Sequence, residues 1–230
     1  MLAINGRSMT TPIQWTVAVV VSVVLVAALQ VALSSKGSSR FSRTLSLSKE
    51  PKRRIQHAVT GTVLVLISYY LPMEYCRIAL GVGISVVLIA YYGYNSWFQR
   101  TFRELLRPNE WDRLPGAFWF LVGTLVTTFF DDVAVGRFAV LSLAYADPMA
   151  AWIGSAVSSP RLPPGASLAG STACFFTSLA LATWTFRLPS EEALIGAVTC
   201  TLSEAIPVGN DNLCIPIATA ASIMAYRKWA

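Results

Sequence analysis

The sequence predicts an all-α, polytopic integral membrane protein with a bundle of about eight transmembrane helices and the N-terminus outside. Hydrophobic residues make up 54% of its 230 residues and charged residues only 13%, about half the charged share of an average soluble domain. Mean hydropathy is +0.55. The apolar residues also fall into runs near the roughly 20 residues that a bilayer-spanning helix needs. So few charges could not cover the surface of a soluble fold.

Eight apolar segments follow one another along the chain. They cover about residues 13–33, 57–72, 76–94, 115–130, 137–157, 168–187, 191–207 and 213–229. The second, fourth and seventh are short, so seven or nine spans remain open. We expect a transmembrane anchor at 1–34, a basic cytoplasmic loop at 35–56 and a catalytic membrane domain at 57–230.

The orientation follows from the basic residues. Seven of them follow the first segment against one acidic residue, Glu50, and this pattern retains a loop in the cytoplasm. Alternation then places 12 of the 18 basic residues on the cytoplasmic side and Asp131-Asp132 outside. The C-terminal Arg227-Lys228 pair is an exception. We therefore attribute the net charge of +6 to topology and to anionic headgroups, and expect no nucleic-acid partner.

Metal chemistry based on thiols or imidazoles is not expected. The four cysteines are scattered through apolar stretches, without the paired spacing of a zinc site or a disulfide framework, and the chain has one histidine. We interpret the cysteines as small buried residues.

Among the residues of the predicted spans, Asp147 has the highest expected free-energy cost of insertion into the membrane. A carboxylate within a membrane span costs roughly 2.5–3.5 kcal/mol on insertion scales and by default indicates a functional site. Pro148, directly after it, removes a backbone donor and disturbs the helix. Carboxylate and carbonyl oxygens suit a hard cation such as Mg²⁺. The alternative interpretation is that Asp147 has a structural role, in which its carboxylate pairs with an arginine or a hydroxyl and holds helices together.

The fifth loop carries Gly165, Ser167, Gly170 and Ser171 just before a predicted helix. Backbone amides in such a loop can bind phosphate, helped by the helix N-terminus. The alternatives are an ordinary turn and close helix packing through the small residues between Ala150 and Ser155.

Two further groups of polar residues flank apolar segments. Glu204 and the Asn210-Asp211-Asn212 run could bind metal, ribose or base, although Asn and Asp are also ordinary loop residues. Arg53 and Arg54 precede His57 at the start of the second segment. Topology alone explains the arginines, and an imidazole at an interface is as often structural as catalytic.

Alternation brings these groups to one membrane face, because the first, fifth and seventh loops are all predicted to be cytoplasmic. Cations, carboxylates and a Gly/Ser loop together are the parts of a phosphoryl-transfer site. The sequence contains neither a GxxxxGK[ST] P-loop nor the motif set of soluble protein kinases. A lipid acceptor would present its hydroxyl at the interface while its chains stay among the helices.

Four stretches in order along residues 50–228 resemble the membrane-embedded, CTP-dependent lipid kinase family, which includes diacylglycerol, dolichol and phytol kinases. They are Arg53-Arg54-Ile-Gln-His57 with Thr60-Gly61, then Leu114-Pro-Gly-Ala-Phe-Trp-Phe-Leu-Val-Gly123, then Asp147-Pro148 to Gly154 with Ser167-Leu-Ala-Gly170-Ser171, and finally Glu204 to Asp211-Asn212-Leu-Cys-Ile-Pro216. The second stretch and the short length resemble the diacylglycerol kinase branch most.

The resemblance implies transfer of the γ-phosphate of CTP to diacylglycerol, giving phosphatidate, with Mg²⁺ or Ca²⁺. The site would face the cytoplasm at the endoplasmic reticulum or nuclear envelope. The implied roles are metal binding by Asp147, Glu204 and Asp211, catalysis by Asp147 and His57, and nucleotide or phosphate binding by Arg53, Arg54, Gly165, Ser167, Gly170, Ser171 and Asn212.

Two positions depart from the family pattern. Ala166 stands where the family usually has Lys, with Arg161 as a possible substitute, and Asn210 stands where Asp is frequent. Three alternatives therefore stay open: a dolichol or phytol kinase, a cytidylyltransferase like the CDP-diacylglycerol synthases, and a non-catalytic membrane scaffold or transporter of the same fold.

Overall fold

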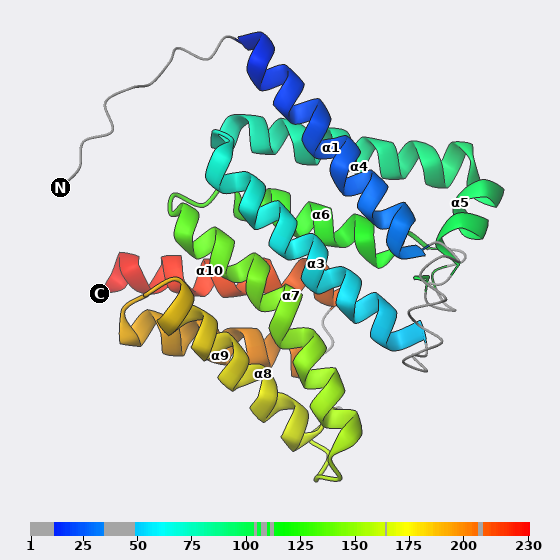
Figure 1. Cartoon of the computed structure of the whole chain (residues 1–230). Coiled ribbons are helices and arrows are strands. Elements are labelled where there is room, and N and C mark those ends of the chain that lie inside the picture. The colour runs from blue at the N-terminus through cyan, green and yellow to red at the C-terminus, as the bar shows by residue number, and fades with distance from the viewer. Residues whose placement is uncertain are drawn as a thin grey trace.

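Nine α-helices account for most of the described chain, and the described residues form no β-strand (Figure 1). The computed structural model describes residues 12–34, 49–103, 105–106, 110, 113–163, 165–206 and 209–230. The elements are α1 (Pro12–Ser34), α3 (Lys49–Tyr70), α4 (Met73–Gly93), α5 (Asn95–Phe102), α6 (Gly116–Thr127), α7 (Val133–Ala156), α8 (Leu168–Ala180), the π-helical η2 (Leu181–Thr185), α9 (Ser190–Ala205) and α10 (Asp211–Trp229).

The long helices run back and forth between two ends of the molecule (Figure 1). At one end, which extends from the right to the bottom of that view, α3 begins, α4 leads through α5 to α6, α7 turns into α8, and α9 turns into α10. We call this the basic end, because α3 begins here and the predicted loop with the most Lys and Arg residues leads into this helix. The opposite end carries the C-terminus and is called the C-terminal end.

Each of the eight predicted apolar segments corresponds to a helix, and the sixth is divided between α8 and η2. Among the described residues, three helices are long and apolar enough to cross a membrane: Pro12–Ala32, Met73–Gly93 and Val133–Ala156, whereas Gly116–Thr127 is apolar but shorter. One boundary was wrong, because α3 begins at Lys49 and the last part of the predicted loop 35–56 is therefore helical. Pro51 falls in its first turn, where a missing N–H breaks no helical hydrogen bond. Residues 1–11 of the anchor and 35–48 of the loop lie outside the described residues.

Helix α7 is the centre of the bundle and contacts α3, α6, α8, α9 and α10. Two-thirds of its apolar window, 67%, is buried, against 6% for α1 and 11% for α4. Residues Phe138, Leu143 and Ala144 of α7 are completely buried. In contrast, α1 exposes Val17, Val24 and other large apolar side chains. An apolar outer surface of this kind matches a hydrocarbon environment.

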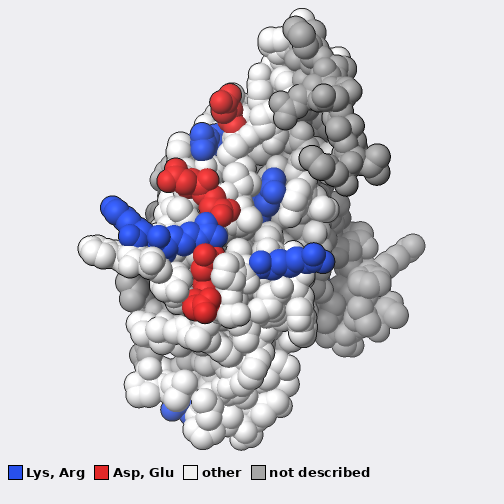
Figure 2. All heavy atoms as spheres, turned by 90° about the vertical axis from the view of Figure 1, so that its left-hand side faces the viewer, with Lys and Arg blue, Asp and Glu red and all other residues white. Residues whose placement is uncertain are grey.

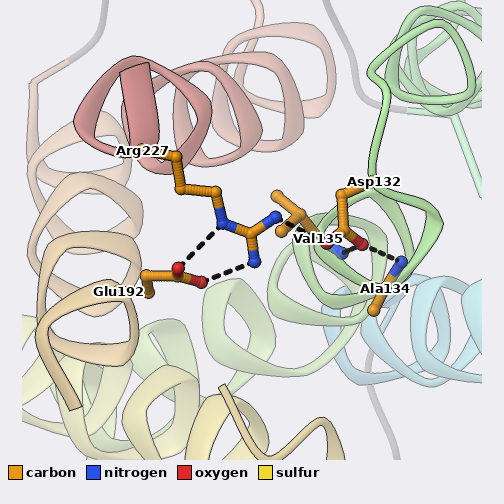
Figure 3. A network of polar contacts seen from close by, with 5 residues as sticks. All are labelled: Asp132, Ala134, Val135, Glu192 and Arg227. Carbon is orange, nitrogen blue, oxygen red and sulfur yellow. Dashed lines mark hydrogen bonds and ion pairs between the residues drawn. The ribbon is translucent and has the colours of Figure 1, made fainter. Parts of the chain in front are cut away.

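A network of charges joins three helices at the C-terminal end (Figure 3). Arg227 on α10 donates from Nε and Nη2 to the two carboxylate oxygens of Glu192 on α9, at 2.8 and 2.7 Å. Its Nη1 donates to Asp132 Oδ2 at 2.5 Å, while Asp132 Oδ1 accepts from Ala134 N and Val135 N at the start of α7. Figure 2 looks onto this end, where acidic and basic side chains lie together. The charge of Arg227, which opposed the predicted orientation, is thus balanced locally.

Candidate functional site

The sequence-predicted site residues lie toward the basic end of the bundle. Arg53, Arg54 and His57 are on the first half of α3, Asp147 is in the second half of α7, Ser167 to Ser171 begin α8, Glu204 is in the last turn of α9, and Asp211 and Asn212 begin α10. The structure therefore places residues that are more than 150 positions apart in sequence at the same end of the molecule.

The carboxylates of Asp147, Glu204 and Asp211 interact through their charges, and we call these three residues the acidic cluster. The charge of Glu204, in the last turn of α9, interacts with those of Asp147, in the second half of α7, and Asp211, at the start of α10. One carboxylate oxygen of Glu204, Oε2, is buried and has no hydrogen-bond partner in the described part of the chain. Burying an acceptor without a partner costs free energy that a bound cation or donor would recover.

The acidic cluster is not a preformed metal centre. Among the described residues, no group of three or more His, Cys, Asp or Glu side chains is close enough to hold a metal ion. Mg²⁺ typically keeps several water ligands and takes only one or two protein carboxylates, together with substrate phosphates. The donor chemistry of Asp147, Glu204 and Asp211 therefore fits a cation that arrives with a phosphate ligand better than one bound by protein alone.

The register between α8 and α9 places a hydroxyl next to this cluster. Sγ of Cys174 on α8 lies 3.9 Å from Sγ of Cys200 on α9, and the two helices are antiparallel. One turn further toward the basic end, Ser171 therefore comes opposite Glu204. The Oγ atom of Ser171 is also buried without a described hydrogen-bond partner. Ser171 and Glu204 are thus the two buried polar groups on this interface that a ligand would satisfy.

The first four backbone amides of α8 are already hydrogen-bonded within the protein. Leu168 N donates to Pro160 O at 2.9 Å, and Ala169 N donates to Ser159 Oγ at 3.1 Å. Gly170 N and Ser171 N donate to Oγ and O of Ser167, at 3.0 and 2.9 Å. These are the amides that would bind a phosphate at a helix N-terminus. A phosphate at this loop would have to use hydroxyl groups instead.

Local packing and backbone conformation explain the glycines in and around the fifth loop. A Cβ on Gly170 would meet Ala150 O at 2.7 Å, and a Cβ on Gly154 would collide with Ser167 Oγ, so small residues allow α7 and α8 to approach closely. Gly165 has φ of +149°, which disfavours residues with a side chain, and it is exposed. Arg161, considered above as a replacement for the family's lysine, donates to Gly165 O at 3.3 Å.

His57 lies between two cavities. It is buried, and its ring lies 5.4 Å from that of Phe120 on α6, centroid to centroid. The first cavity, of about 160 Å³, runs among α1, α3, α4, α6 and α7 with mostly apolar walls. The second, of about 190 Å³, lies toward α5 and has Arg53 and Asn212 among its lining residues. Arg54 is half-buried and lines neither cavity.

Sequence reasoning missed two contributors to the second cavity. Glu110 is buried and accepts a hydrogen bond from Gly116 N at 3.0 Å. Gln30 on α1 lines both cavities and donates from Nε2 to Thr60 Oγ1 at 2.6 Å. The signal for Gln30 was available, since it is a carboxamide near the end of an otherwise apolar run. Glu110 stands in a charged loop, where nothing in the pattern distinguishes it.

Comparisons with known proteins add no further assignment. A scan against protein-family models finds no match, and searches of curated proteins and of solved structures find no similar protein. The fold and the candidate site therefore rest on the geometry described above.

Proposed function

We propose that this protein is a CTP-dependent lipid kinase, embedded in the membrane as a bundle of about eight spans, that transfers the γ-phosphate of CTP to diacylglycerol and gives phosphatidate. The single observation that carries the proposal is the acidic cluster of Asp147, Glu204 and Asp211. It lies at the same end of the bundle as Arg53 and His57, which line a cavity with apolar walls. Phosphoryl transfer needs positioned cations and carboxylates together with an oriented acceptor.

The acidic cluster would hold Mg²⁺ or Ca²⁺ bound to the nucleotide. The cation supplies charge neutralisation on the phosphate oxygens when it is bound. Like charges among Asp147, Glu204 and Asp211 favour a cation at this place. The buried Oγ of Ser171, which the register of α8 and α9 puts on the same level as Glu204, would add a hydroxyl to the site. Asn212 follows Asp211 directly and lines the second cavity, so the first turn of α10 links the acidic cluster to that cavity.

The two cavities would hold the acceptor, with its hydroxyl near His57. In the reaction, the acceptor oxygen attacks the γ-phosphorus, the bond from phosphorus to the β–γ bridging oxygen breaks, and CDP leaves. The hydroxyl proton passes to His57 or to water. Arg53, which lines the second cavity, would balance charge on the transferred phosphoryl group. CTP as donor, and the endoplasmic reticulum or nuclear envelope as location, rest on the resemblance of the four sequence stretches.

The test is γ-phosphate transfer by the purified protein in detergent. CTP and ATP are offered separately with diacylglycerol, dolichol or phytol. We expect labelled phosphatidate from CTP, and loss of this product in Asp147→Asn. Asp131→Asn is the matched control, because Asp131 is exposed in the connection between α6 and α7 at the C-terminal end. Full activity of Asp147→Asn would overturn the site. Label on dolichol or phytol would change the acceptor, and release of pyrophosphate would indicate a cytidylyltransferase.

A non-catalytic scaffold or transporter is the second candidate, and one observation favours it. The amides at the start of α8 are hydrogen-bonded within the protein, and Ala166 supplies no cation there. If no donor and acceptor pair gives transfer, and nucleotide with Mg²⁺ does not raise the unfolding temperature of the folded protein, this second candidate replaces the first.

A further inference from the structure

Gln30 is a partly buried carboxamide contributed by α1, outside the residues 50–228 that carry the family resemblance. Its Nε2 donates to Thr60 Oγ1 at 2.6 Å, and its Oε1 accepts a hydrogen bond from Gln56 Nε2. Both partners belong to α3 and stand one position before and three positions after His57. These contacts place an amide of the N-terminal helix beside the histidine.

The surroundings of Gln30 combine apolar walls with hydrogen-bond donors. Gln30, Gln56 and His57 line both cavities, and the first cavity is otherwise lined mainly by aliphatic and aromatic side chains. Each amide nitrogen carries two hydrogens. The structure describes one acceptor for the Gln30 amide and one for the Gln56 amide. Each amide therefore keeps a second N–H for an acceptor placed in the cavity.

The cavity is small for a whole lipid. About 160 Å³ is the size of an engineered cavity that holds benzene. A volume of this size suits the polar head of a lipid and the first atoms of its chains, so the remaining hydrocarbon would have to lie outside the cavity. Discrimination between lipid alcohols must then come from groups close to the hydroxyl, where Gln30 stands.

Resting on the lipid kinase function proposed above, we propose that Gln30 is a specificity-determining residue that selects a glycerolipid over an isoprenoid alcohol. A diacylglycerol carries ester carbonyl oxygens within a few bonds of its hydroxyl, and these oxygens accept the second N–H groups of Gln30 and Gln56. An isoprenoid alcohol has only hydrocarbon there. It leaves the two amides facing an apolar chain, and buried polar groups without partners disfavour such a complex.

Gln30→Met tests the proposal, since methionine has a similar length and no amide. We expect the ratio of kcat/KM for diacylglycerol to that for phytol to fall about fivefold to tenfold, the size of one or two lost hydrogen bonds. The change should appear in KM for diacylglycerol, with KM for CTP unchanged. Thr16→Val is the matched control on the same helix, because the Thr16 hydroxyl is exposed and donates to Pro12 O.

A purely structural role for Gln30 makes a different prediction. If the amide only fastens α1 to α3, Gln30→Met lowers the activities with both acceptors by the same factor and leaves their ratio unchanged, and this result would overturn the proposal. A shift of the ratio toward diacylglycerol would overturn it as well.

A binding measurement separates this proposal from the kinase function. The full-length protein is crosslinked with a photoreactive diacylglycerol, and the label is competed with unlabelled diacylglycerol or phytol. In the wild type, diacylglycerol should compete at a lower concentration than phytol, and in Gln30→Met the two should become nearly equal. This readout needs no turnover, so it supports or overturns the role of Gln30 even if no kinase activity is found. Equal competition in the wild type would refute the selectivity.

Discussion

Nδ2 of Asn212 donates a hydrogen bond to the carbonyl oxygen of Gly116 at 3.0 Å, and so joins the first turns of α10 and α6. Gly116 N in turn donates to Glu110 Oε1. Two of the four sequence stretches that carry the family resemblance therefore meet in one contact. Their residues are 96 positions apart in the chain, and the helices that hold them pack along their length.

The packing of α6 on α10 makes Gly123→Ala strongly destabilising. The new Cβ would lie 2.6 Å from the backbone oxygen of Asn212 and 3.0 Å from Cγ of Pro216, and neither the helix backbone nor the proline ring can yield easily. We expect a loss of about 1–3 kcal/mol, the usual cost of overpacking. Gly81→Ala is the control, since a Cβ at this position would meet no atom within 4 Å beyond its own stretch of helix. Thermal unfolding in detergent should show a fall for the first variant and no fall for the second; equal behaviour would argue against this helix pairing.

The capping of α8 predicts a stability effect for Ser167. Its Oγ accepts the hydrogen bond of Gly170 N, so Ser167→Ala should destabilise the protein by about 1 kcal/mol. Ser159→Ala is a matched comparison, because Ser159 Oγ accepts from Ala169 N in the same turn. If Ser167 also contacts phosphate, only its substitution should raise KM for the nucleotide beyond the common loss of stability. Identical kinetics in the two variants would limit Ser167 to capping.

Patterns of hydropathy and charge predicted the helices, because eight apolar runs separated by charged loops constrain the chain strongly. They also predicted that Glu204 and Asp211 share one end of the bundle with Arg53 and His57, because alternation puts the first and seventh loops on the same side. Alternation does not fix the depth of Asp147, which lies inside α7. They could not predict how the fifth loop uses its polar groups. Ser159 lies outside the recognised Ser-x-x-Gly-Ser stretch. Its Oγ nevertheless accepts the hydrogen bond of Ala169 N, one of the backbone amides that were predicted to bind phosphate. The partners of Gln30 were likewise set by long-range packing of α1 on α3.

The charged network at the C-terminal end predicts a pH dependence. Partial burial alone would raise the pKa of Asp132, but the hydrogen bonds from Arg227, Val135 and Ala134 lower it below its ordinary value of 3.8. A lowered pKa in the folded state adds stability that is complete above the ordinary value and is lost as the pH falls through the lowered one. Asp132→Asn keeps the helix cap and removes the charge, so it should cost less than about 1 kcal/mol at pH 7.

Unfolding midpoints in denaturant, compared at pH 7 and pH 3, check this prediction. The difference between wild type and Asp132→Asn should shrink at pH 3, because this pH lies below the ordinary pKa of 3.8, where the unfolded state binds the proton and the contribution of the lowered pKa declines. A difference that stays constant would show that the charge of Asp132 is not the source of the effect. Arg227 also donates two hydrogen bonds to the carboxylate of Glu192. Arg227→Met should therefore lower the free energy of unfolding more than Asp132→Asn does at pH 7.

Glu204 should show opposite effects on stability and function. Its charge is repelled by those of Asp147 and Asp211, and one of its oxygens is buried without a described partner, so without a cation its charge disfavours the folded state. Glu204→Gln removes a like charge. We expect it to raise the unfolding temperature without metal by about 2–4 °C, the shift that corresponds to roughly 1 kcal/mol in a domain of this size. The further stabilisation that Mg²⁺ and CTP give the wild type should disappear in this variant.

The control for Glu204→Gln is Asp131→Asn, an exposed charge at the other end of the bundle, for which both quantities should stay at wild-type values. If Glu204→Gln instead lowers the unfolding temperature and keeps the Mg²⁺ response, Glu204 has a structural role, and the cation must be held elsewhere. A gain of stability together with loss of the Mg²⁺ response is what a ligand-binding carboxylate produces, because the charge needed by the ligand is unfavourable in the protein alone.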